Sequence, residues 1–90
     1  MAKVKEALEI GRNYIVRTVT FHYTGKLKAI WDGWLVLSDA AWVADSGRWA
    51  NALKDGTLNE VEPYVSEVVI NRAAVVDVTL WAHDLPRHQK

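Results

Sequence analysis

An Asp-Gly pair, Asp32-Gly33, interrupts a long stretch of strand-forming residues and limits the possible folds more than any other feature. Asp-Gly supplies the positive backbone angles of a tight two-residue β-hairpin turn. Apolar runs precede and follow the pair, as "LKAI" and "WLVLSDAAW". The sequence therefore predicts an antiparallel hairpin in which Trp31 and Trp34 face each other across the ladder.

The segment before this hairpin predicts one helix and one further strand. Val4, Ala7 and Leu8 recur at helical spacing, and Gly11 is placed to end the helix in a left-handed conformation. The segment "YIVRTVTFH" at 14–22 is rich in β-branched and aromatic residues, as strands are. We expect "YTGK" to turn this strand back into the hairpin, which gives three antiparallel strands in succession.

After Trp42 the pattern changes from strand to helix. In "SGRWANALKDG", Trp49, Ala52 and Leu53 share one helical face, which predicts a short helix inside a long connection. Ser46 is available as its N-cap, and Gly56 follows its end.

Two more strands follow, and together the elements predict the fold class. "YVSEVVI" and "VVDVTLW" read as strands joined by "NRAA", and we expect the polar "DLPRHQK" to fray. A helix and five short, strongly bent antiparallel strands close naturally into a small barrel, since closure removes exposed strand edges. We therefore expect a mostly β single domain over residues 1–90: helix 1–11, strands 1–3 in 12–43, an insertion at 44–63, strands 4–5 in 64–82 and a polar tail at 83–90.

Composition limits the class of protein. Ninety residues suffice for one core, and the absence of cysteine excludes a disulfide framework and thiolate metal sites. "MAKVKEALEI" lacks the apolar core of a signal peptide, and no apolar run approaches the length of a membrane span. The expectation is a soluble cytoplasmic protein that does not enter a membrane.

The charges are balanced overall but unevenly distributed. A formal net charge of zero argues against strong unspecific attraction to nucleic acid. The amino-terminal part is nevertheless basic, an asymmetry that suits either plain solvation or an oriented anionic ligand. Its cationic residues are Lys3, Lys5, Arg12, Arg17, Lys26 and Lys28.

Nothing in the sequence predicts catalysis. The histidines are His22, His83 and His88, and none has a metal-binding spacing; a site in "HDLPRH" would sit on a terminus expected to be mobile. Phosphate-binding glycine loops and nucleophile elbows are both lacking. We expect no catalytic residue, no metal and no cofactor.

Two segments resemble the signatures of the Sm-like (LSm) proteins, the family that includes the bacterial Sm-like RNA chaperone. They are "TGKLKAIWDGWLVLSDA" and "VVINRAAVVDV", and the opening "EIGRNYIVR" is also similar. In this family an Asn usually follows the Asp of the turn, where Gly33 and Trp34 stand, and Asn71-Arg72 replaces an Arg-Gly pair. The matching residues are Gly25, Leu27, Ile30, Asp32, Leu35, Val36, Leu37 and Asp39 in the first segment, and Ile70, Val75, Val76 and Val78 in the second.

The resemblance implies self-assembly. In Sm-like barrels the fourth strand of one subunit pairs with the fifth strand of the next, so rotational symmetry satisfies the open edges. We expect a cyclic homo-oligomer of five to seven subunits; the alternative is a monomeric SH3-like barrel with the same strand order. The expected interface residues are Val65, Val68, Ile70, Val76, Val78 and Leu80.

The resemblance also implies binding of short single-stranded RNA near the subunit junctions. Aromatic rings can stack on nucleobases, and Asn71 and Arg72 offer amide and cationic contacts. Two alternatives stay open: the Trp pair can instead cap the hairpin and pack against a neighbouring strand, and the ring can be a structural or protein-interaction module without RNA. The candidate RNA-binding residues are Trp31, Asp32, Gly33, Trp34, Asn71 and Arg72.

Overall fold

The structure is a computed structural model that describes residues 8–90. The helix expected over 1–11 depends mainly on residues 1–7, which lie outside the described residues. The described part of that range, residues 8–11, is not helical and forms a turn. Gly11 has the left-handed φ expected there, +95°. Among the described residues, no helix is long and apolar enough to cross a membrane.

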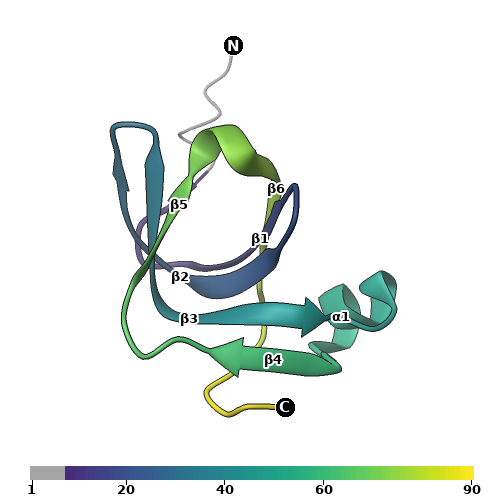
Figure 1. Cartoon of the computed structure of the whole chain (residues 1–90). Helices are drawn as coiled ribbons and strands as arrows, with labels where there is room; N and C mark the ends of the chain where they lie inside the picture. The colour runs from purple at the N-terminus through teal and green to yellow at the C-terminus, as the bar shows by residue number, and fades with distance from the viewer. Residues whose placement is uncertain (1–7) are drawn as a thin grey trace.

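The fold is mostly β, with one bent antiparallel sheet that curls into a small barrel (Figure 1). The strands run in the order β4-β3-β2-β1-β6, and β5 pairs with β3 away from this path. A 3₁₀ helix, η2, joins β5 to β6. The elements are β1 (Asn13–Thr18), β2 (His22–Trp31), β3 (Trp34–Asp45), α1 (Trp49–Asp55), β4 (Glu60–Pro63), β5 (Val68–Asn71), η2 (Arg72–Ala74) and β6 (Val75–Leu80).

The Asp-Gly hairpin is confirmed. Asp32 and Gly33 have φ angles of +48° and +83°, and Trp31 pairs with Trp34 at the end of the β2–β3 ladder. A two-residue turn of this type needs positive φ at both positions, which Asp tolerates and glycine adopts freely.

The turn expected at 23–26 is wrong. The chain turns at residues 19–21, and "YTGK" lies inside β2. The Thr18 hydroxyl closes the actual turn, because it accepts a hydrogen bond from the N–H of Phe21 (3.0 Å) and donates one to its carbonyl (2.7 Å). Gly25 serves close packing instead, since a Cβ there would lie 2.9 Å from the Cβ of Leu37.

The short helix expected after Ser46 is present as α1. Its C-cap is Gly56, with φ +75°, and Ala52 is buried. The expected N-cap is wrong: Arg48 holds that position, and the Ser46 hydroxyl bonds to the carbonyl of Gly47 instead.

Only the second half of the strand expected at 64–70 is present, as β5, because residues 64–67 are not strand. A further strand, β4, lies at Glu60–Pro63, inside the segment expected as an insertion. Both strands pair with β3: residues 34–37 of β3 pair with β5, and residues 41–45 pair with β4. Between the halves, Asp39 takes a left-handed φ of +48° and β3 changes direction.

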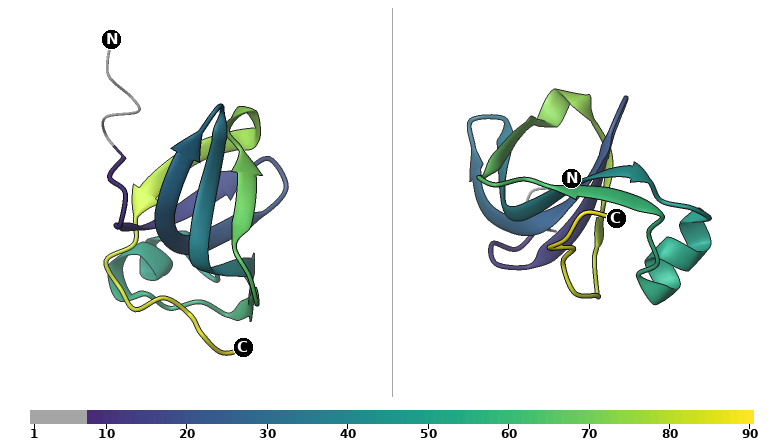
Figure 2. Two further views of the ribbon diagram at one scale, coloured as in Figure 1. Left: turned by 90° about the vertical axis from the view of Figure 1, so that its left-hand side faces the viewer. Right: turned by 60° about the horizontal axis from the view of Figure 1, so that its bottom comes forward.

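Two hydrophobic cores lie on opposite faces of β1. The inner core fills the barrel and includes Tyr14 and Val16. Ile15, between them in sequence, faces an outer core built from α1, β4 and the carboxyl-terminal tail. Figure 2 shows α1 and this tail at the end of the barrel away from η2 and the β2–β3 turn.

The expectation of a frayed tail is wrong. Leu85 is buried in the outer core, and Lys90 exchanges two backbone hydrogen bonds of 3.0 Å with Val61 of β4. Arg87 forms an ion pair with Asp39 at 3.1 Å. The single leucine within a polar segment supplies the apolar anchor, and the backbone of β4 supplies the edge on which the tail lies.

Candidate nucleic-acid interface

Backbone contacts bring the two candidate segments together, although they are far apart in the sequence. The N–H of Arg72 donates to the carbonyl oxygen of Gly33 at 2.9 Å. Next to this bond, Trp34 and Asn71 are paired residues of the β3–β5 ladder. The residues of the β2–β3 turn and of the Asn71-Arg72 pair therefore form one surface at one end of the barrel (Figure 1). We call Trp31–Trp34 with Asn71 and Arg72 the hairpin surface.

The two tryptophans of the hairpin surface are exposed in the single chain. Trp31 keeps 68% of its surface accessible and Trp34 keeps 37%, and neither belongs to a core cluster. Within one chain, Trp31 is therefore not buried against a neighbouring strand, whereas most of the Trp34 surface is covered. An exposed indole has a free face on which a nucleobase can stack.

Asn71 and Arg72 present polar groups beside these rings. The Asn71 side-chain oxygen accepts a hydrogen bond of 2.9 Å from the N–H of Ala73 and so caps η2. This leaves the amide NH₂ to donate. The half-buried Arg72 makes no ion pair with any residue of the described chain, so its guanidinium is available to an anion.

Asp32 has a conformational role in this surface. It is exposed at the tip of the hairpin and has a positive φ, a conformation that Asp adopts more readily than most residues.

In residues 8–90 no three His, Asp or Glu side chains come close enough to hold a metal ion.

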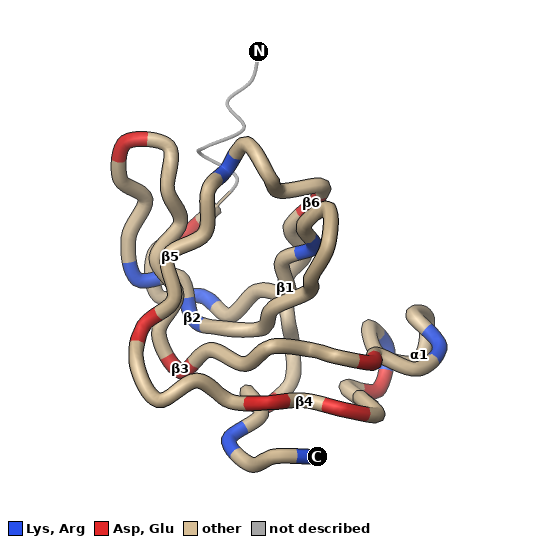
Figure 3. The backbone as a smooth tube through the Cα atoms, in the orientation of Figure 1, with Lys and Arg blue, Asp and Glu red and all other residues tan. Residues whose placement is uncertain are grey.

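A charged cluster lies outside the hairpin surface, where a basic position of β1 comes beside an acidic position of β6 (Figure 3). Arg17 of β1 forms a bidentate ion pair with Asp77 of β6, with Nε at 2.9 and 3.1 Å from the two carboxylate oxygens. This hydrogen-bonded pairing lowers the pKa of Asp77 and raises that of Arg17. The guanidinium also lies 5.0 Å from the ring centre of Trp49, which ties α1 to the barrel.

His22 completes this cluster. Its ring lies against Trp49, with 5.6 Å between the centroids. Partial burial lowers the pKa of His22, and the nearby positive charge of Arg17 adds to the effect. The cluster joins residues up to sixty positions apart, so no local pattern in the sequence indicates it.

The strand edges differ in how they are covered. Among the described residues, β5 pairs only with β3 and β6 only with β1, so each has an edge without a partner. The tail, in contrast, covers the outer edge of β4.

The six residues expected at an interface differ in exposure. Val65, Val76 and Leu80 are exposed, Val68 and Val78 are half-buried, and Ile70 lies in the inner core.

Comparison with known proteins connects this fold to one class. No family model matches the sequence, and no curated protein matches it. A solved structure does match, that of a heptameric archaeal Sm protein described for its implications for the eukaryotic snRNP core. The TM-score is 0.61 at 16% sequence identity, over 87% of this chain and 97% of the archaeal chain. The chain therefore has the fold of the Sm proteins, as the signatures predicted.

Proposed function

We propose that this chain is a non-catalytic, ring-forming Sm-like protein that binds short single-stranded RNA at the hairpin surface. The observation that carries the proposal is the backbone bond from Arg72 to Gly33, because it brings the segment with the exposed indole rings beside an arginine that has no ion-pair partner among residues 8–90. The matching archaeal protein is heptameric. A ring of identical subunits would repeat the hairpin surface around its axis.

The mechanism follows from the groups on this surface. A base stacked on Trp31 or Trp34 gains about 1 to 3 kcal/mol, with little dependence on base identity. Arg72 would contact a phosphate, and the free amide of Asn71 would donate to a base or sugar oxygen. The Asn71 side-chain oxygen already accepts a hydrogen bond from η2, so its amide NH₂ is the group left to read a base edge. With one such group, we expect stacking to contribute more than base-edge recognition.

Open strand edges support the ring. The uncovered edges of β5 and β6 belong to the two strands that join neighbouring subunits in an Sm-type ring, and Val76 and Leu80 are exposed on β6. Unpaired apolar strand edges invite pairing with another chain. Val76→Asp is therefore expected to break assembly, because it places a charge at the junction.

A structural or protein-interaction ring is the second candidate. The net charge of zero favours it, because phosphate neutralisation dominates unspecific RNA affinity. The outer core favours it too, since α1 and the tail add a surface outside the barrel. In that case the exposed tryptophans would contact protein, and RNA would not bind.

Fluorescence anisotropy with labelled U-rich and A-rich oligonucleotides at low salt separates the two candidates. Trp34→Ala is expected to weaken RNA binding about 5- to 100-fold, as the loss of one stacked base requires. Arg72→Ala should weaken binding and reduce its salt dependence. Phe21→Ala, an exposed aromatic at another turn, and Lys54→Ala on α1 are the matched controls. If Trp34→Ala and Arg72→Ala both bind RNA with wild-type affinity, the hairpin surface is not the RNA site.

A further inference from the structure

A polar groove runs along the side of the barrel where the carboxyl-terminal tail lies. One part is a hollow of about 480 Å³ between the start of β1, Lys26 of β2 and the segment that follows β6. A second hollow of about 380 Å³ continues it toward Arg87 and His88. The two share Asn13, Lys26 and Asp84, so they lie side by side, and together we call them the tail groove.

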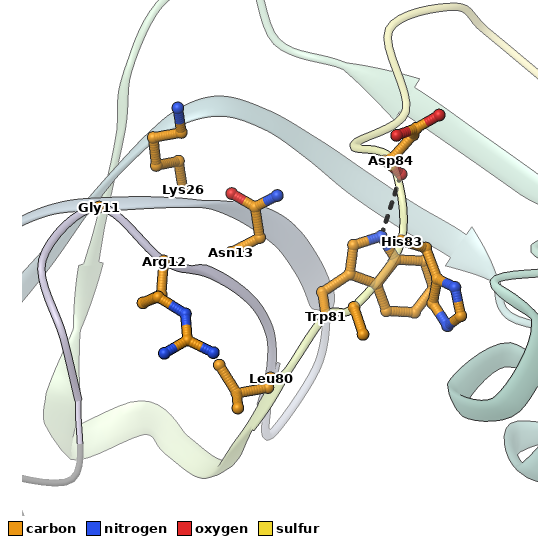
Figure 4. A pocket seen from close by; sticks show the side chains of 9 residues that line it. Gly11, Arg12, Asn13, Lys26, Leu80, Trp81, His83 and Asp84 are labelled. Carbon is orange, nitrogen blue, oxygen red and sulfur yellow. Dashed lines mark hydrogen bonds between the residues drawn. The ribbon is translucent and has the colours of Figure 1, made fainter.

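The tail groove is separate from the hairpin surface. None of its lining residues belongs to 31–34 or to the Asn71-Arg72 pair. Figure 4 shows Arg12, Asn13 and Lys26 on one side of the first hollow and Trp81, His83 and Asp84 on the other. The segment that follows β6 thus supplies a large share of the walls.

Cationic groups predominate in the tail groove. Arg12, Lys26 and Arg87 line it, with His88 at one end and Asp84 as the acidic lining residue. The Asp84 carboxylate points away from Arg12 and Lys26 (Figure 4). The carboxylates of Glu9 and Asp39 contact Arg12 and Arg87 from outside this lining, so Lys26 is the cation that most favours an anionic ligand.

Two of the polar side chains have no protein partner within the described chain. Lys26 makes no ion pair or hydrogen bond there, and the Asn13 amide makes no hydrogen bond. Arg12 and Arg87 are paired, with Glu9 at 2.5 Å and Asp39 at 3.1 Å, but both pairs are exposed. Exposed ion pairs contribute little stability, so an incoming phosphate can replace these carboxylates at small cost.

The two rings that line the first hollow, Trp81 and His83, are not available for stacking. Trp81 is 3% exposed, and its indole N–H donates to the Asp84 carbonyl at 3.1 Å. The His83 ring is held by a 2.8 Å hydrogen bond to the carbonyl of Leu53 and packs on Trp81. Recognition in this hollow therefore depends on charge and hydrogen bonds, which phosphate groups satisfy whatever bases they carry.

We propose that the tail groove is a second, sequence-independent anion site that binds phosphate groups through Lys26, Arg87, Arg12 and Asn13. The phosphates come either from the backbone of a nucleic-acid strand or from a free polyphosphate. This site goes beyond the proposed function, since it neither uses the hairpin surface nor needs a stacked base.

The test compares a double variant of the groove with a charge-matched control. Lys26→Gln with Arg87→Gln removes two cations from the groove, and Arg48→Gln with Lys54→Gln removes two exposed cations near α1. RNA affinity is measured with a labelled twelve-nucleotide strand over a range of salt concentrations. Binding of inorganic pyrophosphate is measured by calorimetry. Thermal unfolding verifies that each variant folds.

For a strand backbone, the groove variant should lose roughly tenfold in RNA affinity at low salt. The slope of log affinity against log salt should fall by about 1.4, at about 0.7 for each lost contact. For a free polyphosphate, wild type should bind pyrophosphate and the groove variant should not. The control should match wild type in both measurements.

Equal behaviour of the groove variant and the control, in RNA binding and in pyrophosphate binding, would overturn the tail-groove proposal. The outcome is independent of the hairpin surface. If Trp34→Ala leaves RNA affinity unchanged while the groove variant loses it, the proposed function fails at its site and the tail groove stands. If Trp34→Ala weakens RNA binding while the groove variant behaves like the control, the tail-groove proposal fails and the hairpin surface remains the RNA site.

Discussion

The backbone N–H of Arg72 donates a 2.9 Å hydrogen bond to the carbonyl oxygen of Gly33, which fastens the β2–β3 turn to the start of η2. Main-chain atoms make this contact, so it does not depend on the indole of Trp34 or on the guanidinium of Arg72. Substitutions of these two side chains therefore test binding without removing the bond that arranges the surface.

Two glycines of the β2–β3 hairpin are expected to respond differently to substitution. Gly25→Ala would place a Cβ 2.9 Å from the Cβ of Leu37, so we expect a loss of about 1 to 3 kcal/mol from overpacking. Gly33 has open space around it and needs only a positive φ. Gly33→Asn should cost less than about 1 kcal/mol, because Asn tolerates that conformation.

Urea unfolding of both glycine variants measures these losses. A Gly25→Ala protein as stable as wild type would contradict the close contact between β2 and β3. A Gly33→Asn protein that is the less stable of the two would contradict the turn conformation.

Thr24 carries a buried hydroxyl without a hydrogen-bond partner in the described chain. Removing an unsatisfied polar group recovers its desolvation cost, so Thr24→Val should stabilise the protein by about 1 kcal/mol. Thr18→Val is the matched control and should destabilise it, because the Thr18 hydroxyl closes the turn to Phe21. Thermal unfolding that ranks the two variants in the opposite order would refute this account.

Leu85 anchors the tail in the outer core, so Leu85→Ala should reduce the free energy of unfolding by about 2 to 4 kcal/mol. His88→Ala, three positions further along the exposed part of the tail, should have little effect. Amide exchange at Val61 and Lys90 should also speed up in Leu85→Ala, since these residues hold the tail on β4. Slow exchange there in the variant would show that the tail is held without its apolar anchor.

The lowered pKa of His22 predicts a pH-dependent stability. The folded state disfavours protonation, so as pH falls below the ordinary value of 6.5 the unfolded state takes up the proton first and the protein loses stability. His22→Gln should flatten the decrease in stability below that pH. Denaturant unfolding at several pH values measures both slopes, and equal slopes in wild type and His22→Gln would rule out this contribution.

Local patterns in the sequence were sufficient for the elements that depend on neighbouring residues. Asp32-Gly33 predicts its hairpin because turn geometry is set by two residues. The face formed by Trp49, Ala52 and Leu53, with Gly56 after it, predicts α1 for the same reason. The Sm-type fold followed from residues such as Gly25, whose close contact with Leu37 supplies a physical reason for a glycine there.

Features that depend on distant contacts could not be predicted in this way. The first turn is not where the sequence predicts it, because a glycine suggests a turn at 23–26. Gly25 instead allows close packing against Leu37, and the Thr18 hydroxyl accepts the hydrogen bond that closes the turn at 19–21. The tail was expected to fray because "DLPRHQK" is polar, yet Leu85 and the edge of β4 hold it in place. The tail groove was missed for the same reason, since its walls exist only once the tail is packed.

The measurement that tests the central claim most directly is the solution mass by light scattering, for wild type and Val76→Asp, with and without a short U-rich or A-rich RNA. We predict a wild-type mass five to seven times that of one chain, an added oligonucleotide when RNA is present, and a folded single chain for Val76→Asp. A wild-type protein with the mass of one chain would contradict the ring, and a ring whose mass RNA never changes would contradict the RNA-binding function.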